Sequence, residues 1–271
     1  MSAALPAPLS ALPAAQLRQV RGVMTDIDDT LTRDGATEPA ARAALDALAR
    51  AQVPVIAITG RPLAWSEAIA AAWPVAAVVA ESGGVALLRE GGRLVTEFAQ
   101  DEATRARHAE RRREVAAQIL RQVPGAQLAR DSAGRATDLA IDHSEFAQLP
   151  PAAIAQVLAL MRAAGLNASV SSIHVNGWFG AHDKWTAAEW MLRRLYGREL
   201  QAEVGRWIYV GDSTNDQPLF ERFPLAVGVA NLRRFEAELR VWPAYITAGE
   251  RGAGFAEVVQ ALLAAQGGPG G

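Results

Sequence analysis

The stretch Gly22-Val23-Met24-Thr25-Asp26-Ile27-Asp28-Asp29-Thr30 decides which fold this chain can adopt. Its apolar beginning predicts a strand that runs into a core, and the strand ends abruptly in three carboxylates. Like charges at i and i+2 repel each other and raise each other's pKa unless a cation neutralises them, and hard oxygen ligands suit Mg²⁺. Taken alone, an acidic pair is as often a solvated turn. The rest of the chain has to decide between the two.

Composition limits the possible functions. The chain has 271 residues, of which 50% are hydrophobic, enough for one large core or a core with a smaller lid domain. Its net charge of −2 offers no basic surface for nucleic acid, and no apolar run is long enough to predict a membrane span. The absence of cysteine excludes disulfides and thiol nucleophiles and makes the cytoplasm the expected location. Residues 1–20, rich in Ala and Pro, are expected to form a flexible tail.

Short apolar runs alternate with amphipathic segments along the chain, a pattern typical of a doubly wound parallel sheet with helices on both faces. We therefore predict an α/β fold. The expected strands are Val23–Asp26, Val53–Ile58, Val75–Ala80, Trp207–Val210, Ala226–Val229 and Tyr245–Thr247. The expected helices are Glu38–Arg50, Leu63–Ala72, Lys184–Tyr196, Asp216–Arg222 and Ala253–Ala264.

Two further strands of this pattern also end in polar groups, and ligands bind at the carboxyl ends of parallel strands. The strand that ends at Ile58 is followed by Thr59-Gly60-Arg61, a hydroxyl, an exposed amide and a guanidinium that together suit a phosphate. The strand that ends at Val210 is followed by the run Gly211–Asp216, whose acids can complete a metal site. The alternative for this run is a simple helix N-cap.

Lys184 is the only lysine among 27 basic residues, the others all being arginine. It opens a predicted helix just before the third acidic strand. A compact ammonium can reach a phosphate and a carboxylate at once, which a planar guanidinium does less well. A single lysine in a chain that otherwise uses arginine therefore indicates a chemical requirement for lysine at this position. The alternative is a surface lysine without a function.

The residues described above resemble the motifs of a known protein superfamily. In order and spacing, Asp26-x-Asp28-x-Thr30, Thr59, Lys184 and Gly211-Asp212-x-x-x-Asp216 resemble the four motifs of the haloacid-dehalogenase-like (HAD) phosphatase superfamily. The resemblance implies a catalytic core at residues 21–84 and 183–271, with residues 85–182 inserted as a smaller α/β cap. This insert looks like the cap of the branch that contains sucrose-phosphate, trehalose-phosphate and mannosylphosphoglycerate phosphatases and eukaryotic-type phosphomannomutases.

The same residues suit phosphoryl transfer through a covalent intermediate. We expect Asp26 to be the nucleophile and Asp28 the general acid and base. Mg²⁺ would bind Asp26, Asp212 and the main-chain carbonyl of Asp28. The phosphoryl oxygens would be held by donors that stabilise spreading charge, namely Thr59, the Gly60 amide, Arg61 and Lys184. Asn215 and Asp216 are expected to orient Lys184 or metal-bound water from outside the first layer of contacts.

The insert is expected to contain a hairpin at Val85–Val95 and, near its end, a strand at Ser169–Asn176. Alternation along that strand would place Ser172, His174 and Asn176 on one face, where they could bind the hydroxyls of a sugar. The alternative is an ordinary strand with a solvated face. A lid of this kind would also exclude water and macromolecules from the site.

Three classes of function follow. The leading one is a Mg²⁺-dependent phosphatase for a small phosphorylated metabolite, such as a sugar phosphate. The second is a phosphomannomutase-like phosphosugar mutase, which would have to protect its phosphorylated aspartate from water. The third is a phosphate-binding module without catalysis, which the complete set of acids and Lys184 disfavours.

Overall fold

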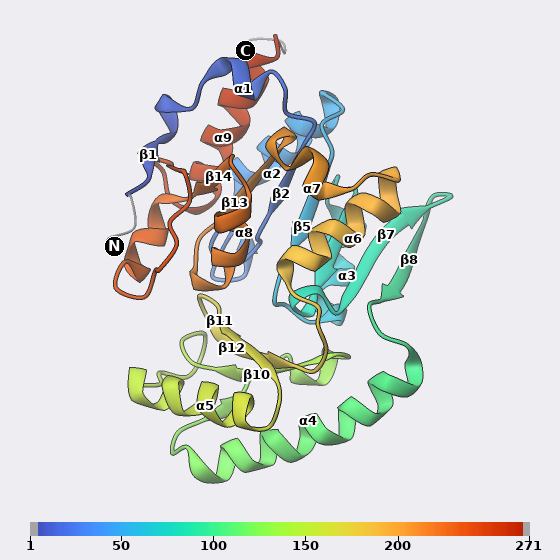
Figure 1. Cartoon of the computed structure of the whole chain (residues 1–271), viewed down its shortest axis with the longest axis vertical. Coiled ribbons are helices and arrows are strands. Elements are labelled where there is room, and N and C mark those ends of the chain that lie inside the picture. The colour runs from blue at the N-terminus through green and yellow to red at the C-terminus, as the bar shows by residue number, and fades with distance from the viewer. Residues whose placement is uncertain (1–4, 268–271) are drawn as a thin grey trace.

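A parallel sheet with helices on both faces is the centre of the computed structural model, which describes residues 5–267, so the fold prediction is confirmed (Figure 1). The sheet has nine strands in the order β1-β15-β14-β13-β2-β5-β6-β7-β8. From β1 to β6 in this order, neighbouring strands pair in parallel. The pairs β6–β7 and β7–β8 are antiparallel. The strands are β1 (Ala7–Pro8), β2 (Gly22–Thr25), β5 (Val55–Ile58), β6 (Ala77–Ala80), β7 (Val85–Glu90), β8 (Arg93–Phe98), β13 (Trp207–Gly211), β14 (Ala226–Gly228) and β15 (Tyr245–Ile246).

Successive residues of each central strand enter two different cores, because side chains alternate across a sheet. Val23 packs with α1, α2, α3 and α9 on one face, and Met24 packs with α6, α7 and α8 on the other. The strands are buried on both faces, which explains why they read as continuous apolar runs. The helices are α1 (Ala14–Leu17), α2 (Pro39–Arg50), α3 (Leu63–Ala72), α6 (Lys184–Tyr196), α7 (Leu200–Glu203), α8 (Gln217–Arg222) and α9 (Arg251–Ala265).

Two expected boundaries differ from the structure. The hairpin predicted at Val85–Val95 forms and runs on to Phe98, but β7 pairs with β6 and extends the core sheet, so the cap begins after Phe98 rather than at residue 85. The expected flexible tail is also wrong for residues 5–20. There Ala7–Pro8 pairs with β15, and Leu9, Leu12 and Leu17 are buried, because leucines set among the prolines provide an apolar face for α9. Residues 1–4 lie outside the described part of the chain.

The cap lies beyond one end of the core sheet (Figure 1). It consists of a four-stranded antiparallel sheet in the order β11-β12-β10-β9, which packs against two helices through a separate apolar core. Its elements are α4 (Glu102–Gln122), β9 (Gln127–Leu128), β10 (Asp138–Asp142), α5 (Pro151–Ala163), β11 (Asn167–Val170) and β12 (His174–Trp178). None of the helices within residues 5–267 is long and apolar enough to cross a bilayer.

The strand expected at Ser169–Asn176 is instead a hairpin, with β11 and β12 joined by a turn at residues 171–173. The Ser171 side chain explains the difference. Its hydroxyl accepts a hydrogen bond from the His174 amide at 3.0 Å, and a serine that binds the backbone in this way favours a turn over a strand. His174 and Asn176 still share one face of β12, but Ser172 lies in the turn.

A buried carboxyl group joins the cap to the core. Glu81, which is fully buried, follows β6 with a left-handed φ of 50° that the surrounding contacts must hold in place. It accepts hydrogen bonds from the Leu63 amide at the start of α3 and from the Ala136 amide of the cap, both at 2.9 Å. It also accepts from the amide of Thr137 and from its hydroxyl, the latter at 2.6 Å. One side chain therefore fixes the approach of cap and core.

We predict that Glu81→Gln lowers the free energy of unfolding by about 2–3 kcal/mol, because an amide group would face main-chain donors and leave at least one of them buried without a partner. Urea denaturation followed by circular dichroism would measure the change. The matched control is Glu110→Gln, at an exposed position on α4, which should stay within about 0.5 kcal/mol of the wild type. Equal stability of the two variants would contradict this role of Glu81.

Candidate active site

Three adjacent strands bring the predicted residues to one edge of the sheet. Asp26 directly follows β2, Thr59 directly follows β5 and Asp212 directly follows β13, and these strands are neighbours in the order β13-β2-β5. All three residues are buried, with at most 4% of their surface exposed. Their convergence is the geometry expected where parallel strands end.

Lys184 lies at the centre of this edge. Its Nζ donates hydrogen bonds to Asp26 Oδ1 and Asp216 Oδ1, both at 2.7 Å. The residue is 4% exposed and is the first of α6, where a capping box between Asp183 and Thr186 fixes the start of the helix. The lone lysine therefore contacts the leading aspartate directly, and its catalytic role stays a prediction.

The loop after β13 is shaped around Asp216. The second oxygen of Asp216 accepts hydrogen bonds from the amides of Asp212, at 2.9 Å, and Ser213, at 3.0 Å. A Cβ on Gly211 would lie 2.5 Å from that oxygen, so only glycine allows the carboxylate to approach the turn. Tyr209 also donates its hydroxyl to Asp216, at 2.5 Å. Asp216 thus contacts Lys184, whereas the contact found for Asn215 is with the Ser213 hydroxyl, and the orienting roles expected for both residues stay predictions.

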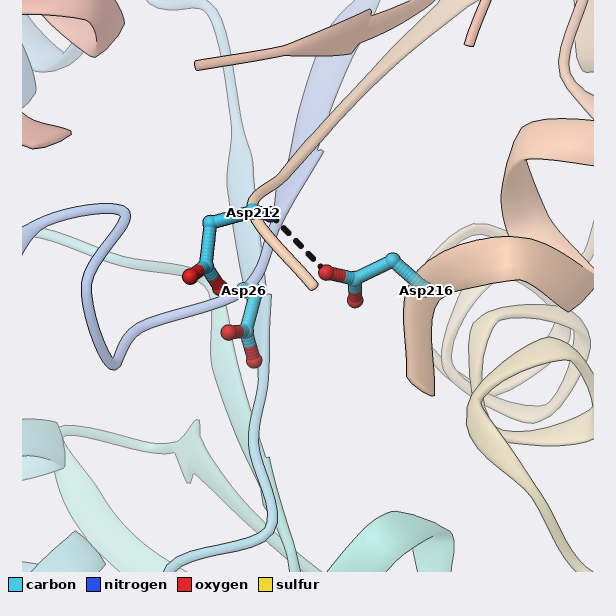
Figure 2. Close-up of side chains that lie close together, drawn as sticks. All are labelled: Asp26, Asp212 and Asp216. Atoms are coloured by element: carbon cyan, nitrogen blue, oxygen red, sulfur yellow. Dashed lines mark hydrogen bonds between the residues drawn. The ribbon is translucent and has the colours of Figure 1, made fainter. Parts of the chain in front are cut away.

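One oxygen each of Asp26, Asp212 and Asp216 lies within 4.8 Å of the others, close enough to bind a single cation (Figure 2). Asp212 Oδ1 is buried and has no hydrogen-bond partner among the described residues, which leaves it available as a ligand. Buried hard oxygen donors of this kind fit Mg²⁺. The carboxylate of Asp28 is not part of this cluster. The main-chain carbonyl of Asp28 is the group expected to bind the metal, and that contribution stays a prediction.

The electrostatics of the cluster also favour a cation. Burial raises the pKa of Asp26 to about 7, against the attraction of Lys184 and with added repulsion from Asp216 and Asp28. Burial, together with repulsion from Asp26 and Asp216, raises the pKa of Asp212 well above its usual range. Although burial opposes the charged form of Lys184, the two carboxylates beside it raise its pKa. A divalent ion would offset the repulsion among these carboxylates that the single ammonium of Lys184 does not neutralise.

Asp28 turns toward the neighbouring strand. Arg61 Nε donates to Asp28 Oδ1 at 2.9 Å, and the Thr59 hydroxyl lies 3.4 Å from Asp28 Oδ2. Arg61 also donates to Glu145 of the cap at 2.9 Å. The guanidinium that we expected to bind phosphate therefore joins Asp28 to the cap, because three acidic groups surround it, the third being Asp131 at 3.6 Å.

The predicted sugar-binding residues of the cap are engaged with other residues. His174 Nε2 lies 2.9 Å from Glu145, and Asn176 donates to Asp138 at 3.0 Å and to the Gly60 carbonyl at 3.3 Å. Ser172 is buried, and its hydroxyl has no partner in the described part of the chain. Asn176 thus connects cap to core, whereas His174 contacts Glu145 within the cap, and the role of both residues toward a sugar stays a prediction.

Sequence reasoning missed several residues of the site. Arg234 and Asn231 reach Asp212 at 3.0 and 3.4 Å, and Arg251 and Arg234 hold Asp29 at 2.8 and 2.7 Å. Although burial opposes it, these two arginines lower the pKa of Asp29. With 26 arginines in the chain, no spacing distinguishes these two. Glu145 lies in the cap, where no motif marks it.

Comparisons with known proteins agree with this geometry. The family model of sucrose-6F-phosphate phosphohydrolase matches residues 21–262. No curated protein sequence matches the chain significantly.

Solved structures similar to 90% or more of the chain include three with TM-scores from 0.64 to 0.68. One is protein 0175 of Thermoplasma acidophilum, with TM-score 0.68, 16% identity and coverage of 90% of this chain and 98% of that one. Another is the C-terminal domain of the C. albicans trehalose-6-phosphate phosphatase, with TM-score 0.67, 14% identity and coverage of 97% and 99%. The third is the sucrose-phosphatase of Synechocystis, solved with sucrose and phosphate, with TM-score 0.64, 18% identity and coverage of 90% and 98%. At these identities the likeness shows the fold.

The family match spans most of the chain and includes every residue of the cluster around Lys184. The chain therefore belongs to the sucrose-6F-phosphate phosphohydrolase family of HAD-like phosphatases.

Proposed function

We propose that this phosphatase hydrolyses the phosphate monoester of a sugar or similar small metabolite through an aspartyl-phosphate on Asp26. The observation that carries the proposal is the pair of 2.7 Å hydrogen bonds from Lys184 to Asp26 and Asp216. They hold one Asp26 oxygen in place at the strand ends, beside Asp28 and Thr59. The name of the family and the similarity to sucrose and trehalose-6-phosphate phosphatases support a sugar phosphate as the substrate.

In the first half of the reaction, a carboxylate oxygen of Asp26 attacks phosphorus and the bond from phosphorus to the ester oxygen breaks. Asp28 gives a proton to the departing alkoxide. Lys184, Thr59 and the Gly60 amide hold the phosphoryl oxygens as charge spreads over them. Asp26 then carries the phosphoryl group as a mixed anhydride.

In the second half, a water molecule attacks phosphorus and the bond from phosphorus to the Asp26 oxygen breaks. Asp28, now a carboxylate, takes a proton from this water. Arg61, which donates to Asp28 at 2.9 Å, supports the ionised form. Orthophosphate leaves and both aspartates return to their starting states, so atoms and protons balance over the cycle.

Mg²⁺ is the proposed cofactor, held by Asp26 and Asp212 with the Asp28 carbonyl as a further proposed ligand, whereas both oxygens of Asp216 accept hydrogen bonds from other residues. It would supply the positive charge that reduces repulsion between the anionic nucleophile and the anionic phosphate. The Asp212 Oδ1 atom, which is buried and has no hydrogen-bond partner among residues 5–267, supports this assignment.

A screen of phosphorylated metabolites with Mg²⁺ tests the proposed function. Release of orthophosphate indicates hydrolysis, whereas an isomerised sugar phosphate would indicate a mutase. Trehalose, sucrose and mannose phosphates should lead the panel, together with an aryl phosphate as a general substrate. If none of these substrates released orthophosphate, the proposal would be contradicted.

The two aspartates should respond differently to substitution. We predict that Asp26→Asn has no turnover on any ester, because no oxygen nucleophile remains. Asp28→Asn should lose about 10²–10⁴-fold on sugar phosphates but much less on aryl phosphates, whose leaving groups need little protonation. Steady-state kcat on both substrate types measures this. Equal losses for Asp28→Asn on the two types would refute its role as the general acid.

Metal binding can be measured without turnover. Mg²⁺ at about 100 times its Kd should stabilise the wild type by about 2.7 kcal/mol, visible as a higher melting temperature. Asp212→Asn should lose most of this shift because its free oxygen is a proposed ligand, and the exposed variant Glu110→Gln should keep it. A full Mg²⁺ shift in Asp212→Asn would remove Asp212 from the metal site.

A further inference from the structure

Glu145 stands in a cap loop whose main chain is fixed on two sides. The loop covers residues 143–146, directly after β10. The carboxyl group of Asp142 accepts a hydrogen bond from the Glu145 amide at 2.9 Å. The Ser144 hydroxyl donates to the carbonyl of Ser172, in the neighbouring turn, at 2.9 Å. The side chain of Glu145 therefore extends from a main chain that is held in place.

The carboxyl group of Glu145 lies between two buried side chains. Its Oε1 accepts a hydrogen bond from Arg61 Nη1 at 2.9 Å, and its Oε2 lies 2.9 Å from His174 Nε2. The side chains of Arg61 and His174 are only 7% and 2% exposed. Although burial opposes it, the hydrogen bond with His174 and the charge of Arg61 lower the pKa of Glu145 to about 2. Glu145 therefore presents a fixed negative charge to Arg61 at neutral pH.

Arg61 passes this constraint on to Asp28. A guanidinium is planar, and its donors point in fixed directions. While Nη1 is held by Glu145, Nε donates to Asp28 Oδ1 at 2.9 Å. The other contact of this carboxyl group within residues 5–267 is the Thr59 hydroxyl, at 3.4 Å. The orientation of the Asp28 carboxyl group therefore depends on Arg61, and that of Arg61 depends on Glu145.

Stability alone does not account for the contact between Glu145 and Arg61. Buried charged pairs often add little net stability, because the cost of taking the charges out of water offsets their attraction. Glu81 already joins cap and core through main-chain donors of both parts. A second cap acid, Asp131, lies 3.6 Å from Arg61, beyond hydrogen-bond distance, and is bound to Arg135 at 3.0 Å. Among the described residues, Glu145 is thus the only cap residue that makes a hydrogen bond with Arg61.

We propose that Glu145 is a positioning residue for the general acid: through Arg61 it holds Asp28 in the orientation from which Asp28 protonates the leaving oxygen. The inference rests on the proposed function and assigns the cap a part in the acid step. A proton donor has to lie within hydrogen-bond reach of the leaving oxygen, and a misplacement of about 1 Å can cost about 10²-fold in rate. Attack of Asp26 on phosphorus does not use this contact. The effect of Glu145 is therefore confined to leaving groups that need a proton.

Two substrate probes of similar size test the proposal with the full-length enzyme and Mg²⁺. 4-Nitrophenyl phosphate releases a stabilised phenolate, whereas 4-nitrobenzyl phosphate releases an alkoxide that needs a proton. We expect Glu145→Gln to lower kcat/KM by about 10–10²-fold on 4-nitrobenzyl phosphate and by less than about threefold on 4-nitrophenyl phosphate. The quantity to compare is kcat/KM, because it excludes the hydrolysis of the aspartyl-phosphate, which is common to both substrates. A merely structural role would lower both values equally.

A double variant tests whether Glu145 acts through Asp28. In Asp28→Asn no general acid remains to be positioned, so adding Glu145→Gln should cause no further loss on 4-nitrobenzyl phosphate. The matched control Asp131→Asn removes a cap acid that makes no hydrogen bond with Arg61, and it should leave the ratio of the two kcat/KM values unchanged. His174→Leu removes the group on the other side of Glu145, so the ratio should shift in the same direction by a smaller factor. This variant carries the test if Glu145→Gln does not fold.

The outcomes separate this inference from the proposed function. A wild type without turnover on 4-nitrophenyl phosphate would overturn the proposed function itself. Equal losses of Asp28→Asn on the two probes would overturn the role of Asp28 as the acid, and the inference with it. A selective loss in Asp28→Asn without one in Glu145→Gln would overturn the inference alone. Additive losses in the double variant would do the same, because Glu145 would then act independently of Asp28.

Discussion

The ammonium of Lys184, shared between Asp26 and Asp216, is the interaction on which the rest of the site depends. Both carboxylates and the lysine are buried, and taking such charges out of water is costly unless each finds a partner. Removing one partner of a buried pair typically costs about 3–5 kcal/mol. The segments from which these residues come must therefore meet at one edge of the sheet. Beside this pair, Asp212 Oδ1 has no hydrogen-bond partner within the described part of the chain and could bind a cation.

The cap is tied to this edge by polar contacts. Arg61 connects Asp28 to Glu145, and Glu81 binds the main chain of both parts. Because a buried charge or donor needs its partner, these contacts define one arrangement of cap over core rather than a loose lid. The same arrangement encloses a cavity beside Asp28, so the residues that position the cap also determine the shape of this cavity.

The core was predictable from sequence because its signals are local. Buried parallel strands read as short apolar runs, and the acids that follow them stand at the strand ends where Asp26 and Asp212 are found. Lys184 was predictable because it is the only lysine. The cap was less predictable: the turn at residues 171–173 depends on a Ser171 hydroxyl that competes with strand pairing. Arg61 and Glu145 could not be paired from sequence, because a contact between residues 84 apart leaves no local pattern. The leucines of residues 5–20 were hidden by the surrounding alanine and proline.

The most direct test of the central claim is the turnover of Lys184→Arg on an aryl phosphate. The charge is kept, but a planar guanidinium cannot place a single donor centre 2.7 Å from both Asp26 and Asp216 in the space of the ammonium. We predict that kcat/KM falls by about 10²–10³-fold, the loss typical of a misplaced donor to the transition state, while circular dichroism shows a folded chain. A folded Lys184→Arg enzyme with kcat/KM within about threefold of the wild type would contradict the account, because a diffuse positive charge would then suffice where we infer a shared ammonium.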